Sequence, residues 1–491
     1  MSGSPSRPPS ASAPTQLFVA GQWRDATGGR TFAVEDPATG EELARVADAS
    51  PEDGLAALDA AVAAQEAWAA TSPLERSELL RRTFDAVMDR RDELAALMTA
   101  EMGKPLAESA AEVTYGAEYV RWFAGEATRV GGRYDTAPEG TGRILVGRRP
   151  VGPCYLITPW NFPLAMATRK IAPAIAAGCT AVVKPASLTP LTTLAFVGLL
   201  AEAGLPAGVV NVVPTSSSSA VSEPILAHPR LRKLSFTGST EVGRTLLRQS
   251  ADGILRTSME LGGDAPFLVF DDADLDAAVD GALLAKLRNG GQACTAANRF
   301  LVQEGVAEEF TLRVVERVRQ VRVGPGAAPG TTLGPLIDAA AVERVTELVD
   351  DAVARGARVL LAPELPSGLS PDGHFLAPVV LADVPVEARV WREEIFGPVL
   401  ALRTFADEDE AVALANDTDR GLVSYAFTRD LARGHRLVER LESGMVGLNS
   451  GIVSNAAAPF GGIKTSGLGR EGGELGIEEY QSVTYAFLPR S

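Results

Sequence analysis

Residues 288–299, from Arg288 to Arg299, read RNGGQACTAANR, and this stretch organises the interpretation of the chain. It places Cys294 after a Gly-Gly-Gln run and shortly beyond a helix that we expect over residues 275–287. Because glycines let a backbone approach a ligand closely, the position suits a reactive thiol. Free cysteines in isolation are more often inert core side chains. Cys294 is therefore a candidate nucleophile whose role depends on the other motifs of the chain.

Several motifs accompany Cys294. They are TPWNFP at 158–163, FTGSTEVG at 236–243, MELGGDAP at 259–266, EEIFGP at 393–398 and PFGGIKTSGLGREGG at 459–473. Their order, spacing and residues resemble those of the aldehyde dehydrogenase superfamily from about Gln16 to the end of the chain. Within the superfamily, FDDADLDAAVDGA at 270–282 and KLRNGGQAC at 286–294 are most similar to succinate-semialdehyde dehydrogenases.

Composition limits the partners of the chain. Its 491 residues, 46% of them hydrophobic, can bury a large core and fill two or three domains. Lys and Arg number 46 and Asp and Glu number 62, so the net charge is −16. This acidic balance disfavours nucleic acid and anionic membranes as partners. An anionic substrate would need arginines dedicated to holding it.

The three cysteines and three histidines lack the spacing of a disulfide framework or a zinc site, so we expect no metal. Reduced thiols fit a cytoplasmic location. Since no uninterrupted apolar run reaches about 18 residues, we expect no membrane span. Residues 1–15 are rich in Ser, Pro and Ala, lack the apolar core of a signal peptide and predict a disordered tail.

Helices dominate the part of the chain that follows residue 50. Ser72 before Pro73 predicts a capped helix start, and the apolar spacing behind it predicts an amphipathic helix that ends near Gly103. Further on, Tyr115 and Tyr119 stand at helical spacing. Core packing explains these two tyrosines adequately, and we assign them no function from sequence.

Apolar runs alternate with helical segments between Cys154 and Gly238, which is typical of βαβ units on a parallel sheet, and a second α/β region follows Thr257. The predicted fold class is α/β and aldehyde dehydrogenase-like, with a Rossmann-type cofactor domain, an α/β catalytic domain and a small β oligomerisation arm. The predicted bounds are 16–130 and 152–258 for the NAD(P)-binding domain, 259–465 for the catalytic domain, and 131–151 and 466–491 for the arm. We expect the chemistry at the interface of the two α/β regions.

Oxidation of an aldehyde requires a nucleophile to add before the carbon can release hydride. The resemblance implies that Cys294 forms a thiohemiacetal and then a thioester. It also implies that Asn161 and the Cys294 backbone N–H hold the oxyanion, and that Glu260 activates water to hydrolyse the thioester. Without the resemblance, Asn161 would indicate only a turn and Glu260 only an exposed charge.

The standard Gly-x-Gly-x-x-Gly fingerprint is absent. Instead, the segment from Gly238 to Gly243 closes a strand and opens a helix, where free N–H groups and the helix dipole favour a phosphate. The resemblance implies further cofactor contacts at Trp160, Gly238, Ser239, Leu261, Glu394 and Phe396.

In the family that the chain resembles, the positions of Lys184 and Ser187 hold the adenine ribose. Relatives with glutamate in place of Ser187 tend to prefer NAD, because the carboxylate repels a 2′-phosphate. Serine removes that repulsion and Lys184 supplies positive charge, so we expect NADP or NAD as cofactor, with NADP slightly favoured. The turn at 215–219, TSSSS, departs from the glycines that relatives commonly carry there.

Arg169 and Arg288 match arginines that succinate-semialdehyde dehydrogenases use for the substrate carboxylate, and Ser454 matches an anchoring serine. The resemblance therefore implies NAD(P)-dependent oxidation of succinate semialdehyde to succinate. Two departures are Ala296, where many relatives have a second cysteine, and Ala456, where relatives often have glutamate.

Other functions stay open at this point. They are the same chemistry on glutarate semialdehyde or a simple aliphatic aldehyde, a non-catalytic binding protein on the same fold, and a thioesterase-like hydrolase that uses Cys294 alone. Unpaired edge strands and the resemblance together predict a homodimer or homotetramer. The physiological aldehyde and the thiolate pKa of Cys294 are not readable from the sequence.

Overall fold

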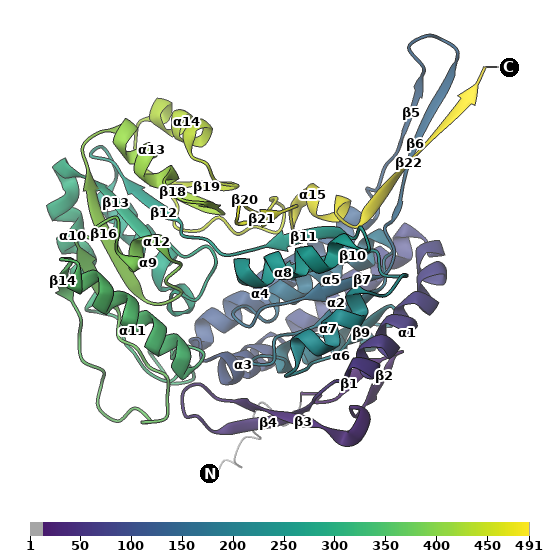
Figure 1. Ribbon diagram of the computed structural model, residues 1–491, viewed down its shortest axis with the longest axis horizontal. Helices are drawn as coiled ribbons and strands as arrows, with labels where there is room; N and C mark the ends of the chain where they lie inside the picture. Colours follow the sequence, from purple (N-terminus) through teal and green to yellow (C-terminus); the bar gives the residue numbers. More distant parts are fainter. Residues whose placement is uncertain (1–12, 491) are drawn as a thin grey trace.

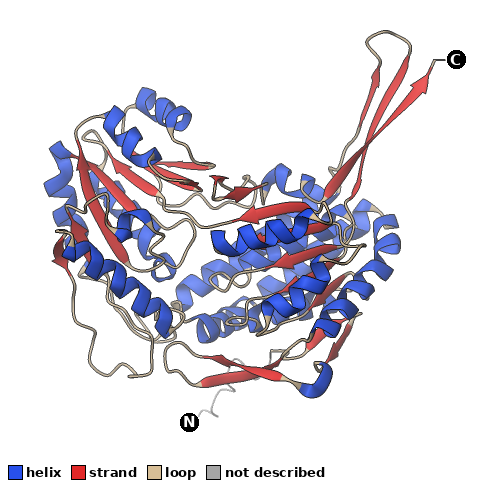
Figure 2. Ribbon diagram, viewed as in Figure 1, coloured by secondary structure: helices blue, strands red, loops and turns tan. Residues whose placement is uncertain are grey.

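The computed structural model describes residues 13–490 and shows two α/β lobes with a β arm that projects from one of them (Figures 1 and 2). Residues 1–12 of the predicted tail lie outside the described residues. Ala13 and Pro14 line a small cavity, and the carbonyl oxygen of Thr15 accepts a hydrogen bond from the N–H of Ala47 at 2.8 Å. The last residues of the predicted tail are thus packed on the protein.

An eight-stranded sheet forms the first lobe. Its order is β2 (Gln22–Arg24), β1 (Leu17–Val19), β9 (Val210–Val212), β8 (Ala181–Lys184), β7 (Cys154–Ile157), β10 (Lys233–Thr237), β11 (Arg256–Glu260) and β21 (Gly467–Leu468). The run from β9 to β11 is parallel, which confirms the predicted βαβ units. Because the order runs β7-β8-β9 in one direction and β10-β11 in the other, the switch point lies between β7 and β10.

Two sets of helices cover this sheet. The connections between its parallel strands are α5 (Ala165–Ala177), α6 (Leu191–Glu202), α7 (Ser218–Leu226) and α8 (Thr240–Ala251), and the N-terminal set is α1 (Pro51–Ala70), α2 (Pro73–Asp89), α3 (Arg91–Met102) and α4 (Leu106–Ala127). Ser72 caps α2 as predicted. The prediction of one helix reaching Gly103 was wrong, since the chain breaks at Arg90, whose side chain pairs with Glu93 and Glu202.

A seven-stranded sheet forms the second lobe. Its order is β14 (Arg358–Leu361), β15 (Val379–Ala382), β16 (Val399–Phe405), β13 (Arg299–Gln303), β12 (Pro266–Val269), β18 (Val423–Phe427) and β19 (Met445–Leu448). Its helices are α9 (Leu275–Leu287), α10 (Glu304–Val318), α11 (Ala339–Ala354), α12 (Arg389–Arg392), α13 (Glu408–Asn416) and α14 (Leu431–Arg440). The bounds of α9 confirm the predicted helix, whereas the predicted domain boundary at 258/259 falls inside β11.

The arm consists of β5 (Arg133–Thr136), β6 (Gly142–Pro150) and β22 (Gln481–Pro489), paired antiparallel (Figure 1). This confirms that residues 131–151 join the C-terminal strand. Smaller elements are β3 (Thr31–Glu35) with β4 (Glu42–Ala47), β17 (Arg420–Gly421) with β20 (Ile463–Lys464), α15 (Gly473–Glu478), and the 3-10 turns η2 (Thr27–Gly29) and η3 (Arg288–Gly291). Between residues 13 and 490, no helix has the length and apolar character needed to cross a membrane.

Two buried glutamates hold the N-termini of helices in the first lobe. Glu101, in α3, accepts hydrogen bonds from the N–H groups of Leu191 and Thr192 at the start of α6, both at 2.8 Å. Glu112, in α4, accepts from the N–H groups at 164–165, at 3.1 and 3.2 Å, where α5 begins. Negative charge is favoured at a helix N-terminus. The helix pair α3 and α4 thus fixes where α5 and α6 begin.

We expect Glu101→Ala to reduce stability by about 2–4 kcal/mol, because two buried N–H groups lose their acceptor. Thermal unfolding followed by circular dichroism measures the change. Glu66→Ala, at an exposed position of α1, is the matched control and should alter stability by less than about 0.5 kcal/mol. Equal melting temperatures for the two variants would contradict the role given to Glu101.

Candidate active site

Cys294 lies on a loop that follows α9 and η3 (Arg288–Gly291). Asn289 and the two glycines after it have φ values of 54°, 64° and 77°, in the left-handed region. A Cβ on Gly291 would stand 2.3 Å from the carbonyl oxygen of Gly397, so this glycine lets two backbone segments pack closely. Cys294 is partly exposed, whereas the other two cysteines of the chain are buried.

Asn161 lies in the loop after β7 and is buried. Its Nδ2 donates to the carbonyl oxygen of Gln292, two residues before Cys294, at 2.9 Å. Because an amide nitrogen carries two N–H groups, the second remains for another acceptor. The carbonyl oxygen of Asn161 accepts from Lys104 Nζ at 2.8 Å and from Asn289 Nδ2 at 3.0 Å. These bonds join the Asn161 loop to the cysteine loop.

Glu260 ends β11, and its side chain is 2% exposed. Among the described residues, neither of its carboxylate oxygens has a hydrogen-bond partner. A Cβ on Gly461 would stand 2.8 Å from Glu260 Oε1, and a Cβ on Gly263 would stand 2.7 Å from the carbonyl oxygen of Cys294. The two glycines therefore let the segment after Glu260 pack directly on the cysteine loop.

A buried charge cluster adjoins Glu260. Arg169 Nε lies 2.5 Å from Glu471 Oε2, and Lys170 Nζ donates to Glu471 Oε1 at 2.5 Å. Burial raises the pKa of Glu260 well above its ordinary value, and the charge of Glu471 adds to this, whereas Arg169 and Lys170 oppose it. Although burial alone would raise the pKa of Glu471, Lys170 and Arg169 bring it below the ordinary value. The pKa values of the two carboxyl groups are thus shifted in opposite directions, upward for Glu260 and downward for Glu471.

The surroundings of Cys294 disfavour its thiolate form. Burial raises its pKa to about 12, and the carboxylates of Glu394 and Glu260 act in the same direction, while the cations Arg169 and Arg288 oppose them. Since only the thiolate is a strong nucleophile, removal of this proton is a step that the surrounding residues must assist.

Unsatisfied hydroxyls line the switch point of the first sheet. The Oγ1 atoms of Thr158 after β7, Thr237 at the end of β10 and Thr240 at the start of α8 are buried without a partner among the described residues. Lys184, at the end of β8, donates to Ser218 Oγ at 3.1 Å, and burial lowers its pKa to about 8. Buried hydroxyls that lack partners beside a helix N-terminus fit the phosphates and ribose of NAD(P).

The predicted phosphate loop forms the turn between β10 and α8. Ser239 Oγ accepts from the N–H of Val242 at 3.4 Å and caps α8. A Cβ on Gly243 would stand 2.5 Å from Leu261 Cδ2, so these two predicted cofactor residues touch. Ser187 is partly exposed in the loop after β8.

The serine turn at 215–219 is held by Asp48. Thr215 Oγ1 donates to Asp48 Oδ1 at 3.0 Å, and Ser216 Oγ donates to Asp48 Oδ2 at 2.7 Å. Hydroxyl side chains therefore stabilise the turn in which we noted the departure from glycine.

Glu394 and Phe396 lie close to the loop that connects Glu260 with the second lobe. Glu394 Oε1 accepts from the N–H of Gly263 at 3.2 Å, and burial raises the pKa of Glu394 to about 7. The rings of Phe396 and Trp160 meet edge to face with centroids 5.5 Å apart. Phe396 has a φ of 53°, which is unusual for an aromatic residue and typical of strain at functional sites.

The three predicted substrate residues have different surroundings. Arg169 is buried, its guanidinium lies 4.1 Å from the ring centre of Phe460, and its Nη1 has no partner among the described residues. Arg288 is partly exposed and lies 5.2 Å from the ring centre of Phe162. Ser454 lines a cavity of about 600 Å³. The pairing of Arg169 with a carboxylate of the same chain was not expected from the sequence.

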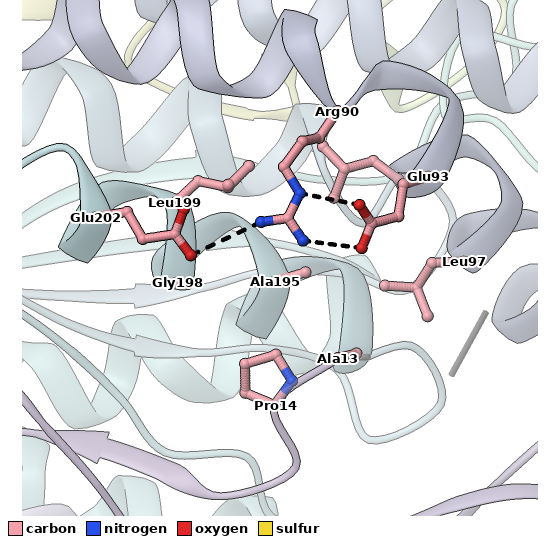
Figure 3. Close-up of a pocket in the computed structure, with 10 residues that line it drawn as sticks. Ala13, Pro14, Arg90, Glu93, Leu97, Ala195, Gly198, Leu199 and Glu202 are labelled. Atoms are coloured by element: carbon pink, nitrogen blue, oxygen red, sulfur yellow. Dashed lines mark hydrogen bonds and ion pairs between the residues drawn. The ribbon is translucent and has the colours of Figure 1, made fainter. Parts of the chain in front are cut away.

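A second, smaller cavity has a different character. It measures about 80 Å³ and lies between α3 and α6, beside Ala13 and Pro14 (Figure 3). Arg90 bridges Glu93 and Glu202 at its wall. No predicted site residue lines this cavity, so we interpret it as a packing gap between α3 and α6.

Sequence reasoning missed four charged residues that support the site: Lys104, Glu112, Lys170 and Glu471. Lys104 Nζ contacts both Glu112 and the Asn161 carbonyl oxygen. The available signal was a charge within an otherwise apolar segment, as for Lys170 in MATRKIAPAIAAG. Glu471 stood inside a quoted motif without an assigned role.

We expect alkylation of Cys294 by iodoacetamide to accelerate about tenfold per pH unit between pH 7 and 9, without a plateau, because the pKa of the thiol is raised to about 12. Glu394→Gln removes a charge that raises this pKa and should speed alkylation at pH 9 by about two- to tenfold. Glu393→Gln is the matched control. Mass spectrometry measures the rates, and a plateau below pH 9 in the unmodified protein would contradict the prediction.

Comparisons with known proteins agree with this geometry. The Aldehyde dehydrogenase family model matches residues 23–486. The succinate-semialdehyde dehydrogenase of Paenarthrobacter nicotinovorans is 56% identical over 443 residues, covering 90% of this chain and 98% of the relative. The glutarate-semialdehyde dehydrogenase of Pseudomonas putida is 49% identical over 472 residues, covering 96% and 97%.

The structural comparison points to the same family. The crystal structure of an E. coli NADP dependent enzyme is similar, with a TM-score of 0.95, 47% sequence identity and coverage of 97% of this chain and 98% of that chain. The predicted resemblance is confirmed, and the chain belongs to the aldehyde dehydrogenase family.

Proposed function

We propose that the protein oxidises succinate semialdehyde to succinate with NADP or NAD. The observation that carries the proposal is the buried guanidinium of Arg169, which keeps one unpartnered nitrogen and acts electrostatically on both Cys294 and Glu260. Arg169 and Lys170 both pair with the one carboxylate of Glu471, so a substrate carboxylate would balance the second positive charge. Similarity to the Paenarthrobacter nicotinovorans enzyme supports this substrate.

The first chemical step is attack of Cys294 Sγ on the aldehyde carbon. The positive charge of Arg169 favours the thiolate against the burial that opposes it. In the tetrahedral adduct the former carbonyl oxygen becomes negative, and the spare N–H of Asn161 and the backbone N–H of Cys294 are the donors that hold it. Preorganisation of Asn161 by its bonds to Lys104 and Asn289 means that little rearrangement is needed.

Bound NAD(P) supplies the hydride acceptor that converts the adduct on Cys294 into a thioester. Glu260 then acts as the general base for hydrolysis, since its free carboxylate oxygens and raised pKa suit proton abstraction from water. Glu471 stays ionised and paired with Lys170 and Arg169, so it does not take this role. The product is the carboxylic acid.

The cofactor proposal rests on the switch point of the first sheet. The proposed contacts are Trp160, Lys184, Ser187, Gly238, Ser239, Gly243, Leu261, Glu394 and Phe396. Lys184 supplies positive charge near the adenine ribose, and Ser187 does not repel a 2′-phosphate. We therefore propose use of both cofactors with a slight preference for NADP, which agrees with similarity to the E. coli NADP dependent enzyme.

The arm supports assembly into a homodimer or homotetramer. Val483, Tyr485 and Phe487 are 65%, 61% and 43% exposed on β22. Exposed apolar residues on an edge strand favour pairing with another copy. In this proposal, residues 16–130 and 152–258 form the NAD(P)-binding domain, residues 259–465 form the catalytic domain, and the enzyme acts in the cytoplasm.

A second candidate substrate is glutarate semialdehyde. It carries the same two functional groups with one more methylene, and the Pseudomonas putida relative is named for it. One methylene in a binding site is worth only about 1–3 kcal/mol of discrimination, so the two substrates are close competitors.

We expect strong turnover of succinate semialdehyde and at least about a thousandfold loss of kcat in Cys294→Ala, because the covalent route is removed. Initial-rate kinetics with NAD and NADP measure both. Cys154→Ala, at a buried thiol away from the site, is the control. Equal efficiency with acetaldehyde would exclude recognition of a carboxylate, and higher efficiency with glutarate semialdehyde would favour the second substrate.

Ser187→Glu should reduce kcat/KM with NADP by at least about tenfold and leave NAD use intact, because the new carboxylate repels the 2′-phosphate. Leu188→Glu adds the same charge at the exposed neighbouring position and serves as the matched control. Parallel kinetics with both cofactors give the ratio. A similar loss in both variants would show that Ser187 does not face the ribose.

A further inference from the structure

Tyr115 and Tyr119 form a hydroxyl pair on α4. Their oxygens lie 2.6 Å apart, and their rings meet edge to face with centroids 5.1 Å apart. Tyr119 is fully buried and Tyr115 is partly buried. The sequence suggested packing alone for these residues, yet the contact is polar and stands at the inner end of a cavity wall.

The Tyr119 hydroxyl also interacts with Arg169. Burial raises the pKa of Tyr119 well above its ordinary value, Tyr115 adds to this, and the charge and hydrogen bond of Arg169 oppose it. A guanidinium can only donate, so in an interaction of these two side chains the Tyr119 oxygen is the acceptor. Within the tyrosine pair, either hydroxyl can be the donor.

When Tyr119 donates to Tyr115, the O–H of Tyr115 is available for another acceptor. Tyr115 lines the cavity of about 600 Å³ that Ser454 also lines. It packs at the same time against the apolar cluster that contains Ala293, the neighbour of Cys294. Tyr115 therefore contacts both the cavity and the apolar cluster beside the nucleophile loop.

We propose that Tyr115 donates a hydrogen bond to the distal carboxylate of the substrate, and that Tyr119 is a positioning residue that orients both Tyr115 and Arg169. The inference rests on the proposed function and names residues that select aldehydes with an anionic far end. A carboxylate accepts from a hydroxyl and a guanidinium together, whereas the methyl end of an aliphatic aldehyde satisfies neither.

The test compares Tyr115→Phe, Tyr119→Phe and the double variant in the full-length enzyme, with succinate semialdehyde and butanal as substrates. Tyr155→Phe is the matched control, since it removes a buried hydroxyl paired with Ser222 Oγ at 2.8 Å elsewhere in the first lobe. Steady-state kinetics give KM and kcat, and thermal unfolding reports any general loss of stability.

We expect Tyr115→Phe to raise KM for succinate semialdehyde about tenfold or more, with kcat within about twofold and butanal kinetics unchanged. Tyr119→Phe should also raise this KM. In the double variant the KM should increase by less than the product of the two single increases, because the two hydroxyls are hydrogen-bonded to each other. Tyr155→Phe should alter neither KM.

The inference would be overturned if the tyrosine variants lost the same activity with both aldehydes, or if their effects on KM were no larger than those of Tyr155→Phe. The proposed function would stand in either case. Multiplicative effects in the double variant would also overturn the inference, since the two hydroxyls would then act independently. A parent enzyme that oxidises butanal but not succinate semialdehyde would instead overturn the proposed function.

Discussion

The interaction on which the rest of the site depends is the buried ion pairing of Glu471 with Arg169 and Lys170. Charges in a protein interior are tolerated when they are paired and hydrogen-bonded, and removal of one partner is costly. Glu471 lies in the C-terminal motif, while both cations lie on α5 in the first lobe. The cluster therefore joins distant parts of the chain. Burial is the main cause of the raised pKa of Glu260, and all three charges of the cluster modify it.

Close packing of backbone explains why the motifs around this cluster are rich in glycine. Gly263 lies against the carbonyl oxygen of Cys294, Gly291 against that of Gly397, and Gly461 against the carboxylate of Glu260. At each position a methyl group would overlap the neighbouring atom. The glycines thus let these segments pack directly against one another.

Local rules predicted the local structure. Helix capping located the start of α2, periodicity located α9, and alternation of apolar runs located the parallel strands of both sheets. The break at Arg90 escaped prediction because the sequence has no glycine or proline there, although the backbone of Arg90 leaves the helical conformation.

For the candidate site, too, contacts between residues far apart in the sequence could not be predicted. Motifs pointed to Cys294, Asn161 and Glu260, and the structure places them on adjoining loops, while their catalytic roles stay proposals. The partnership of Lys170 with Glu471 could not be read from sequence, because the two residues are 301 positions apart and only the folded chain brings them together. The hydrogen bond between Tyr119 and Tyr115 could not be predicted for a related reason. Helical spacing indicates a buried face but does not identify the partners of its side chains.

The long separation between α5 and its counter-charge has a consequence for synthesis on the ribosome. The first lobe also takes β21 from residues 467–468, and the arm takes its edge strand β22 from residues 481–489. In a nascent chain that ends within the second lobe, Arg169 and Lys170 lack Glu471, and the eight-stranded sheet lacks β21. Folding of the first lobe is therefore completed only after residues 467–471 have been synthesised, and a chain truncated before residue 471 would be a substrate for chaperones and proteases.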